Sequence, residues 1–257
     1  MEDRRVELKR EKMVGKVFET NRCGLCTVVK YEGCFDVTVE FHNPKQLVKC
    51  CTGDLVRKQV SNPIFPSFYN SAYIGIGDYS NKDKYLYAIW TGILQRTLSK
   101  EYKEKFEAYK DVAICKEWLD FQNFAEWCVI QKGFQSKDES GRVFHIDKDL
   151  LSGEVKVYSP KTCCFIPIGI NNLFITSGRK NKKWPTGVRF SNEKRKFVAI
   201  CKTNGKNKHL GYFDNVEDAF KAYKEFKESH VKIVAEKWKD LISEEVYLAI
   251  QNWEVSY

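Results

Sequence analysis

Residues 184–239 read WPTGVRFSNEKRKFVAICKTNGKNKHLGYFDNVEDAFKAYKEFKESHVKIVAEKWK. Three short runs in the first half, 187–190, 196–203 and 208–213, are rich in β-branched and aromatic residues. The turns between them read Ser-Asn-Glu-Lys and Asn-Gly-Lys-Asn. Short apolar runs that are joined by turns of this composition predict an antiparallel three-stranded sheet.

A helix is expected directly after this sheet. Asp214 and Glu217, three residues apart, fit the capping box that starts many helices. The apolar residues that follow recur at steps of three and four, so they would form one stripe against the sheet. They are Val216, Ala219, Phe220, Tyr223 and Phe226. The other face of the sheet is then left for a partner.

Four segments of this region, 187–189, 196–200, 210–214 and 217–223, resemble the AP2/ERF DNA-binding domain. Members of that family place the sheet, rather than the helix, in the major groove of double-stranded DNA. Arg and aromatic side chains on their exposed sheet face contact bases and phosphates. The resemblance therefore implies that double-stranded DNA is the partner of the open face.

By its position in the family's pattern, Arg189 is the residue most directly expected to contact DNA. The full set of cationic candidates is Arg189, Lys194, Arg195, Lys196, Lys202, Lys206 and Lys208. In the third strand, Lys208 and His209 stand where plant members often carry Arg and Trp. Three lysines of the expected helix are interpreted instead as a solvated face. They are Lys221, Lys224 and Lys227.

The distribution of charge supports nucleic-acid binding without any resemblance. Residues 179–240 hold 17 Lys and Arg against 8 Asp and Glu, a surplus equal to the net charge of +9 of the whole chain. A positive surface gains affinity for DNA by releasing phosphate counterions, and a small sheet can enter the major groove.

The composition is that of an ordinary folded protein. Of 257 residues, 43% are hydrophobic and 30% are charged, which is enough for two or three small cores. The chain begins with a charged run, and no apolar stretch approaches the ~20 residues that a membrane span needs. We therefore expect a cytoplasmic protein with no membrane partner, whose ten cysteines are reduced thiols rather than a disulfide framework.

Residues 1–66 are expected to form an SH3-like β-barrel. Five strand-like runs are separated by turn dipeptides such as Glu32-Gly33 and Asn43-Pro44. The runs lie at 15–20, 26–31, 36–41, 47–51 and 55–58. Such a module would dock a host protein or add a contact to DNA, and the sequence favours neither role over the other.

Cys23 and Cys26, spaced as Cys-x-x-Cys, raise the alternative of a zinc site with His42, Cys50 or Cys51. A zinc ribbon has a second Cys-x-x-Cys knuckle, which is missing here. Cys50 and Cys51 are adjacent, so their side chains would point to opposite faces of a strand. The interpretation we favour is that the cysteines line the core of the barrel.

The middle of the chain, 67–178, is expected to begin with helices. An amphipathic pattern covers 84–98, and 112–133 predicts an extended segment followed by a second helix. Trp118 and Trp127 are interpreted as packing residues. Strands are then expected at 143–147 and 155–158, an extended segment at 163–166 and a short helix at 170–174, which together predict a β-hairpin followed by a helix.

This order resembles the ββα-metal, or HNH, core of phage homing endonucleases that carry an AP2-like DNA-binding region. In that family an acidic residue and a His end the first strand, and an Asn in the helix completes a metal site. The His activates a water molecule, while the metal stabilises the phosphorane and the leaving oxygen. The resemblance implies Mg²⁺ as the cofactor, and no organic cofactor is expected.

Carried over by position, Asn171 falls on the metal-binding Asn, Asp147 on the general base and Ile146 on the usual metal acid. His145 comes two residues early, on the same side of the expected strand as Asp147 and Asp149 but ~6–7 Å from the family's position. Two interpretations stay open. In the first, His145 and Asp147 are catalytic and Asp147, Asp149 and Asn171 hold the metal. In the second, the core is a nuclease scaffold without catalysis.

The sequence thus predicts an α+β chain of three modules. These are an SH3-like β-barrel at 1–66, a degenerate HNH-like core with helices at 67–178, and an AP2/ERF-like module at 179–257 that ends in a helix capped by Ser243. Three functions are open: a metal-dependent phage DNA endonuclease, a catalytically inactive DNA-binding regulator or host-takeover factor, and a protein-interaction module acting through the N-terminal barrel. Each would act in the cytoplasm of a bacterial host cell.

Overall fold

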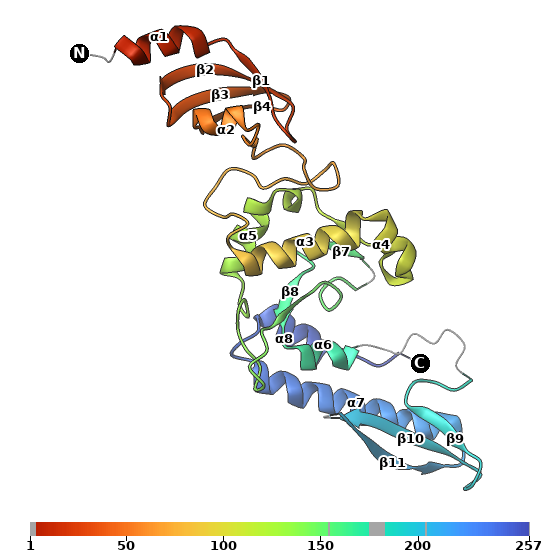
Figure 1. The fold of residues 1–257 in the computed structure, drawn as a ribbon. Coiled ribbons are helices and arrows are strands. Elements are labelled where there is room, and N and C mark those ends of the chain that lie inside the picture. The colour runs from red at the N-terminus through yellow and green to blue at the C-terminus, as the bar shows by residue number, and fades with distance from the viewer. Residues whose placement is uncertain (1–3, 154, 175–182, 204, 257) are drawn as a thin grey trace. The chain divides into compact units, whose positions relative to one another are not determined.

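The computed structural model describes residues 4–153, 155–174, 183–203 and 205–256 (Figure 1). The chain is a mixed α+β protein with several separate sheets, as the sequence predicts at this coarse level. It divides into two compact units, Met1–Cys128 and Val129–Tyr257. The division falls inside the expected 67–178 module, and the three-module organisation stays a prediction. Within the described ranges, no helix is both long enough and apolar enough to cross a membrane.

The first unit opens with helix α1 (Arg4–Met13) and a four-stranded antiparallel sheet (Figure 1). The strands pair in chain order. They are β1 (Val17–Glu19), β2 (Leu25–Gly33), β3 (Asp36–His42) and β4 (Lys45–Cys50). Alternate residues of a strand share one side, which gives this sheet an apolar face with a core of its own. Its fully buried members include Cys26, Val28, Val37, Val39 and Phe41.

This sheet does not close into the barrel predicted for 1–66. β1 and β4 are its two edges, and the part of the chain that the structure describes contains no closed barrel. The run at 55–58, predicted as a fifth strand, belongs in part to a short helix, α2 (Thr52–Val56). The Cys51 thiol accepts the N–H of Asp54 at 3.4 Å and donates to its carboxylate at 3.1 Å. This pair of contacts caps the helix and turns the chain away from a strand.

Three cysteines of the N-terminal sheet belong to its core or pack against it. Cys23 and Cys26 are buried in it, and Cys50 packs against it. Burial raises the pKa of the Cys26 thiol and raises that of Cys50 to about 11. His42 is engaged elsewhere, since its Nε2 lies 2.8 Å from the hydroxyl of Thr27.

The rest of the first unit is built around aromatic side chains. Its elements are α3 (Lys84–Leu98), α4 (Lys100–Lys105), the 3-10 helix η1 (Glu107–Tyr109), β5 (Ala113–Ile114), the 3-10 helix η2 (Glu117–Leu119) and α5 (Phe121–Ile130). The helix predicted at 84–98 is confirmed with the same bounds. Trp118 and Trp127 pack as predicted, with ring centroids 4.7 Å apart. Trp90 donates its indole N–H to the backbone carbonyl of Trp118 at 2.7 Å.

The second unit begins with short strands and a helix: β6 (His145–Asp147), β7 (Val157–Tyr158), β8 (Cys164–Ile166) and α6 (Ile168–Phe174). β6 pairs antiparallel with β8, and Ile146 lies opposite Phe165. The second strand of the hairpin before α6 is therefore β8, and not the strand predicted at 155–158. The last two residues of that predicted strand form β7, which lies in the segment between β6 and β8. All three residues of β8 are buried, while Val155 is 54% exposed, so the more apolar run takes the inner position.

A three-stranded antiparallel sheet forms where the sequence predicts it. Its strands are β9 (Val188–Ser191), β10 (Lys196–Thr203) and β11 (Lys206–Phe213), in the order β11-β10-β9. The register between β10 and β11 shifts after Ala199. Ala199 pairs with Gly211 but Ile200 pairs with His209, which leaves Leu210 as the extra residue of a β-bulge.

Helix α7 (Val216–Trp238) covers one face of this sheet, and α8 (Glu244–Gln251) follows it (Figure 1). The predicted apolar stripe is confirmed, because residues of α7 share a core with residues of β10. Buried members of this core are Ala199, Cys201, Ala219, Phe220 and Tyr223. The predicted cap of α8 is also confirmed, since the Ser243 hydroxyl accepts the N–H of Val246 at 3.3 Å.

The start of α7 differs from the prediction by one residue. Asn215, rather than Asp214, is the cap: its side-chain oxygen accepts the N–H of Asp218 at 2.8 Å. Its amide group donates to the Asp218 carboxylate, also at 2.8 Å. Asn215 and Asp218 have the same spacing as Asp214 and Glu217, so the sequence offers two overlapping boxes and the second one forms.

Candidate nucleic-acid interface

The face of the sheet β9–β11 that α7 leaves open is called the outer face below. Because Ala199 points into the core with α7, its neighbour Val198 points to the outer face. Val198 lies opposite Arg189 on β9 and Tyr212 on β11. These three residues form one row across the sheet, called the central row. Val198 is 1% exposed and Tyr212 is 47% exposed, so a guanidinium and a phenol flank a buried valine.

More polar groups continue the outer face toward the end of the β10–β11 hairpin. Ile200 lies opposite His209, and Lys202 opposite Asn207. The His209 ring is 4.7 Å from the ring of Tyr212, centroid to centroid, so an imidazole and a phenol form a pair. Sequence reasoning had left Tyr212 out, although strand alternation from Val198 through the register would have included it.

Two of the predicted DNA contacts, Lys196 and Lys202, share the outer face with Arg189. Lys196 is partly neutralised, because its Nζ lies 3.0 Å from the Asp214 carboxylate. Lys202 is exposed and makes no ion pair with any residue that the structure describes. Arg189 and Lys202 are therefore the cations of this face that are left for an anion.

Lys194 and Arg195 lie in the turn between β9 and β10, and both are exposed. Arg195 has a φ of 51°, which places it in the left-handed region of a tight turn. Lys194 pairs with its neighbour Glu193 at 2.9 Å, an exposed ion pair of little energetic weight. The turn thus extends the basic surface past the end of the strands.

Lys206 and Lys208, also predicted as DNA contacts, lie on the α7 side of the sheet. Lys208 pairs with Cys201, which faces the core, and its Nζ lies 4.5 Å from the ring centroid of Phe226 on α7. The cause is the bulge at Leu210, because one extra residue reverses the alternation of side chains that precede it. These two lysines are thus separated from the face that carries Arg189.

One of the three lysines expected on a solvated helix face is buried. Lys221 is exposed, and Lys224 pairs with Glu254 at 3.1 Å, but Lys227 is only 8% exposed. Lys227 follows Tyr223 by one helical turn, so it lies on the apolar stripe. The prediction of a solvated face is wrong for this residue.

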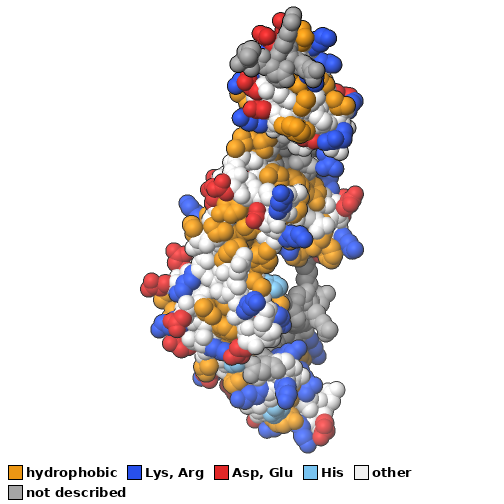
Figure 2. Space-filling view, turned by 60° about the vertical axis from the view of Figure 1, so that its left-hand side comes forward, with side chains coloured by type: hydrophobic (Ala, Val, Ile, Leu, Met, Phe, Trp, Pro, Cys, Tyr) orange, Lys and Arg blue, Asp and Glu red, His pale blue; other side chains and the backbone are white. Residues whose placement is uncertain are grey.

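The basic surplus predicted for 179–240 is visible on the surface. In the space-filling view, Lys and Arg side chains crowd the part of the molecule formed by β9–β11 and the neighbouring end of α7 (Figure 2). Residues 179–182, which contribute to the surplus in the sequence, lie outside the described residues.

The residues carried over from the HNH pattern lie on β6, in the turn after it and on α6. His145 opens β6 and is exposed. Asp147 closes β6 and is 7% exposed, and its Oδ1 accepts the N–H groups of Asp149 at 3.0 Å and Leu150 at 2.9 Å. Burial raises the pKa of the Asp147 carboxyl, although these N–H groups act in the opposite direction. In this structure Asp147 holds the turn that ends the strand.

Asp149 lies in this turn and not on the strand face where it was expected, because β6 ends at Asp147. Its side chain is 69% exposed and pairs with Lys148. Asn171 is half-buried on α6. In the described ranges, no group of three or more His, Cys, Asp and Glu side chains is arranged to hold a metal ion. Mg²⁺ and the roles of these residues stay predictions.

Comparison of the chain with protein-family models, with curated proteins and with solved structures finds no match.

Proposed function

We propose that the chain is a double-stranded DNA-binding protein and that the outer face of β9–β11 is its DNA-binding surface. The observation that carries the proposal is the central row, in which Arg189 and Tyr212 flank Val198 on the side of the sheet away from α7. The resemblance to the AP2/ERF domain supports it, since that family uses the same side of its sheet.

The chemistry of the outer face suits a duplex. A guanidinium can donate two hydrogen bonds to one guanine edge in the major groove, which makes Arg189 the candidate for base recognition. Lys202 is free to neutralise a phosphate, and Lys194 and Arg195 extend the positive field along the same surface. Tyr212 and His209 supply aromatic rings and hydrogen-bonding groups beside them.

The test is a binding titration of the full-length protein with a labelled DNA duplex between ~50 and 200 mM salt. Binding that weakens steeply with salt, and that falls further when Arg189 is replaced by Ala, supports the proposal. Affinity that does not respond to salt would count against phosphate contacts, and full affinity in the Arg189→Ala variant would remove the outer face from the interface.

Metal-dependent DNA cleavage is a second candidate function. It is favoured by the order β6, β8, α6, a pair of antiparallel strands followed by a helix, with Asp147 ending the first strand and Asn171 on the helix. Mg²⁺, held by Asp147, Asp149 and Asn171, would stabilise the charge that develops on phosphate, and His145 would take the proton of the attacking water. If DNA is bound but not cleaved, the alternative is a catalytically inactive DNA-binding regulator or host-takeover factor.

A protein partner on the N-terminal sheet is a third candidate. Val17, Leu25 and Leu47 are 50%, 46% and 57% exposed, and each precedes a residue that belongs to or packs against the core. They therefore lie on the side of the sheet away from that core. Pull-down from a bacterial host lysate with the full-length chain and with a Leu25→Ser, Leu47→Ser variant tests this, since capture that survives both changes excludes this surface.

A further inference from the structure

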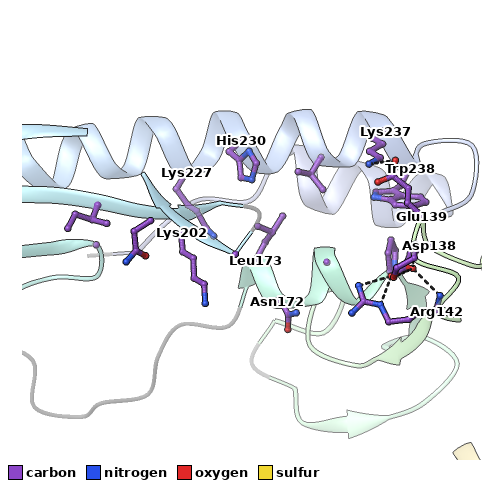
Figure 3. A pocket seen from close by; sticks show the side chains of 18 of the residues that line it. Asp138, Glu139, Arg142, Asn172, Leu173, Lys202, Lys227, His230, Lys237 and Trp238 are labelled. Carbon is purple, nitrogen blue, oxygen red and sulfur yellow. Dashed lines mark hydrogen bonds and ion pairs between the residues drawn. The ribbon is translucent and has the colours of Figure 1, made fainter. Parts of the chain in front are cut away.

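A cavity of about 960 Å³ lies in the second unit (Figure 3), and none of the three residues of the central row lines it. Helix α7 forms one wall with a line of residues one turn apart, from Tyr223 to Trp238, and α6 contributes Asn172 and Leu173. On the strand side, Ile200 and Lys202 lie on the part of β10 that extends past its pairing with β9. A cavity of this size can hold a ligand as large as a nucleotide.

The charges around the cavity do not balance. Four cationic side chains line it, together with the carboxylates of Asp138 and Glu139. Asp138 is paired with Arg142 at 3.0 Å, and Glu139 is paired with Lys237. No acidic side chain of the described residues is left for the other two cations, Lys202 and Lys227. Figure 3 shows both on the same side of the cavity, where Lys227 points in from α7.

Lys227 is the less expected of the two, because the residue is only 8% exposed and yet makes no hydrogen bond or ion pair with any described residue. Its ammonium is not fully enclosed, and Lys227 lines the cavity. The loss of water around its ammonium lowers the pKa of Lys227, and the nearby Cys201 thiol opposes this to a smaller extent. A charge that has lost part of its water and has no partner is costly, so such groups in folded proteins are usually paired or meet a ligand. An anion in the cavity would supply that partner.

We propose that this cavity binds a phosphate group, with the ammonium groups of Lys227 and Lys202 as its principal contacts. Two neutral groups that line the same cavity can donate hydrogen bonds to further oxygens: the amide of Asn172 and an N–H of the His230 ring. The phosphate comes from a small phosphorylated molecule or from the backbone of a nucleic acid. The site shares Lys202 with the proposed DNA-binding surface. It goes beyond that surface because its other contacts, Lys227, Asn172 and His230, lie on α7 and α6, and because it needs neither Arg189 nor Tyr212.

The first measurement uses the full-length protein, orthophosphate and ATP, with sodium chloride at matched ionic strength as the reference. Both phosphate compounds are expected to raise the melting temperature above the chloride reference, and calorimetry gives the affinity. Lys227→Met keeps the aliphatic stem but removes the charge, so it should weaken binding roughly ten- to hundredfold while the protein stays folded. Lys232→Met, an exposed position on α7 that does not line the cavity, is the matched control.

The second measurement separates the two sources of phosphate with duplex DNA and the same variants. Response to orthophosphate and ATP, with unchanged DNA affinity in Lys227→Met, identifies a small ligand. Loss of DNA affinity in Lys227→Met, with a salt dependence lower by about one phosphate, identifies a backbone phosphate. Should Lys227→Met fail to fold, Lys202→Met provides a second variant for the measurements with orthophosphate and ATP only, because Lys202 also belongs to the outer face.

The proposal is overturned if the wild-type protein responds to neither class of probe, or if Lys227→Met and Lys202→Met respond as the wild type does. Lys227 would then be a core lysine whose stem fills an apolar gap and whose ammonium reaches water through the cavity. Arg189→Ala leaves the cavity intact. If the outer face does not bind DNA, Arg189→Ala keeps full DNA affinity; if the phosphate site does not exist, Lys227→Met responds to orthophosphate and ATP as the wild type does.

Discussion

Gly187 lies against the ring of Tyr223, so closely that a Cβ at Gly187 would come within 2.1 Å of the ring. Gly187 also has a φ of +80°, in the region that glycine adopts most easily. Gly187→Ala should therefore lower the free energy of unfolding by about 2–4 kcal/mol, through backbone strain and displacement of a core ring. Chemical denaturation measures the effect. Gly141→Ala is the control, since Gly141 has a φ of +78° with open space around it, and an equal loss there would show that strain alone is responsible.

The cap of α7 gives a second prediction. Asn215→Ala removes both contacts with Asp218 and should cost about 1 kcal/mol of stability. Asp214→Ala should cost less, because Asp214 makes only an exposed ion pair with Lys196. Thermal or chemical denaturation of the two variants side by side compares them. A larger loss of stability in the Asp214 variant would show that Asp214, and not Asn215, caps α7.

The third prediction concerns recognition of DNA sequence by the outer face. If Arg189 contacts a base edge, Arg189→Ala should weaken binding to a preferred duplex by about 1–3 kcal/mol, and binding to random duplex by less. A selection from random duplexes with the wild-type protein supplies the preferred site. Lys221→Ala, on the exposed side of α7, is the control and should leave both affinities nearly unchanged. Equal losses on both duplexes for Arg189→Ala would make Arg189 a phosphate contact.

The fourth prediction concerns cleavage. With Mg²⁺ or Mn²⁺ present, an active ββα-metal core would nick supercoiled plasmid, and His145→Ala would abolish nicking without changing DNA affinity. Asp147→Asn would abolish it too if the carboxylate binds the metal. A nicking assay with the wild type and both variants decides between the roles. Activity that survives in His145→Ala but not in Asp147→Asn removes His145 as the general base and leaves Asp147 as metal ligand or base. Three inactive proteins that still bind DNA exclude the nuclease.

The buried carboxyl of Asp147 gives a prediction of pH dependence. Burial raises its pKa above the ordinary value near 3.8, so the folded state carries an energetic penalty once the group is ionised in both states. Asp147→Asn keeps an oxygen for the N–H groups of Asp149 and Leu150 but has no charge to bury. The variant should be at least as stable as the wild type near neutral pH, and this difference should disappear below about pH 4. Denaturation across the pH range would contradict this if the wild type were the more stable at neutral pH.

Long periodic patterns were predicted well from the sequence. The helix at 84–98 was correct to the residue, because its apolar stripe extends over several turns and nothing competes with it. The three-stranded sheet was correct because its runs are bounded by strong turn sequences. Short runs failed: 55–58 has the composition of a strand, but the cap formed by Cys51 and Asp54 decides the local structure.

The errors within the candidate site have a similar origin, since each depends on a shift of one residue or one turn. A bulge leaves little trace in composition, so the position of Lys208 against Phe226 could not be obtained from alternation alone. The burial of Lys227 could be predicted from the sequence, because Lys227 lies four residues after Tyr223 and therefore on the predicted apolar stripe.

The bulge at Leu210 determines which side chains near the end of the β10–β11 hairpin face α7 and which face away from it. Because side chains alternate, one inserted or deleted residue at this point exchanges the two faces for every residue between it and the turn. A lineage of this chain could therefore move Lys206 and Lys208 to the outer face, and Asn207 and His209 to the helix side, without a single substitution. Length variation at Leu210 would change which side chains this surface presents, while the sheet and its core stay in place.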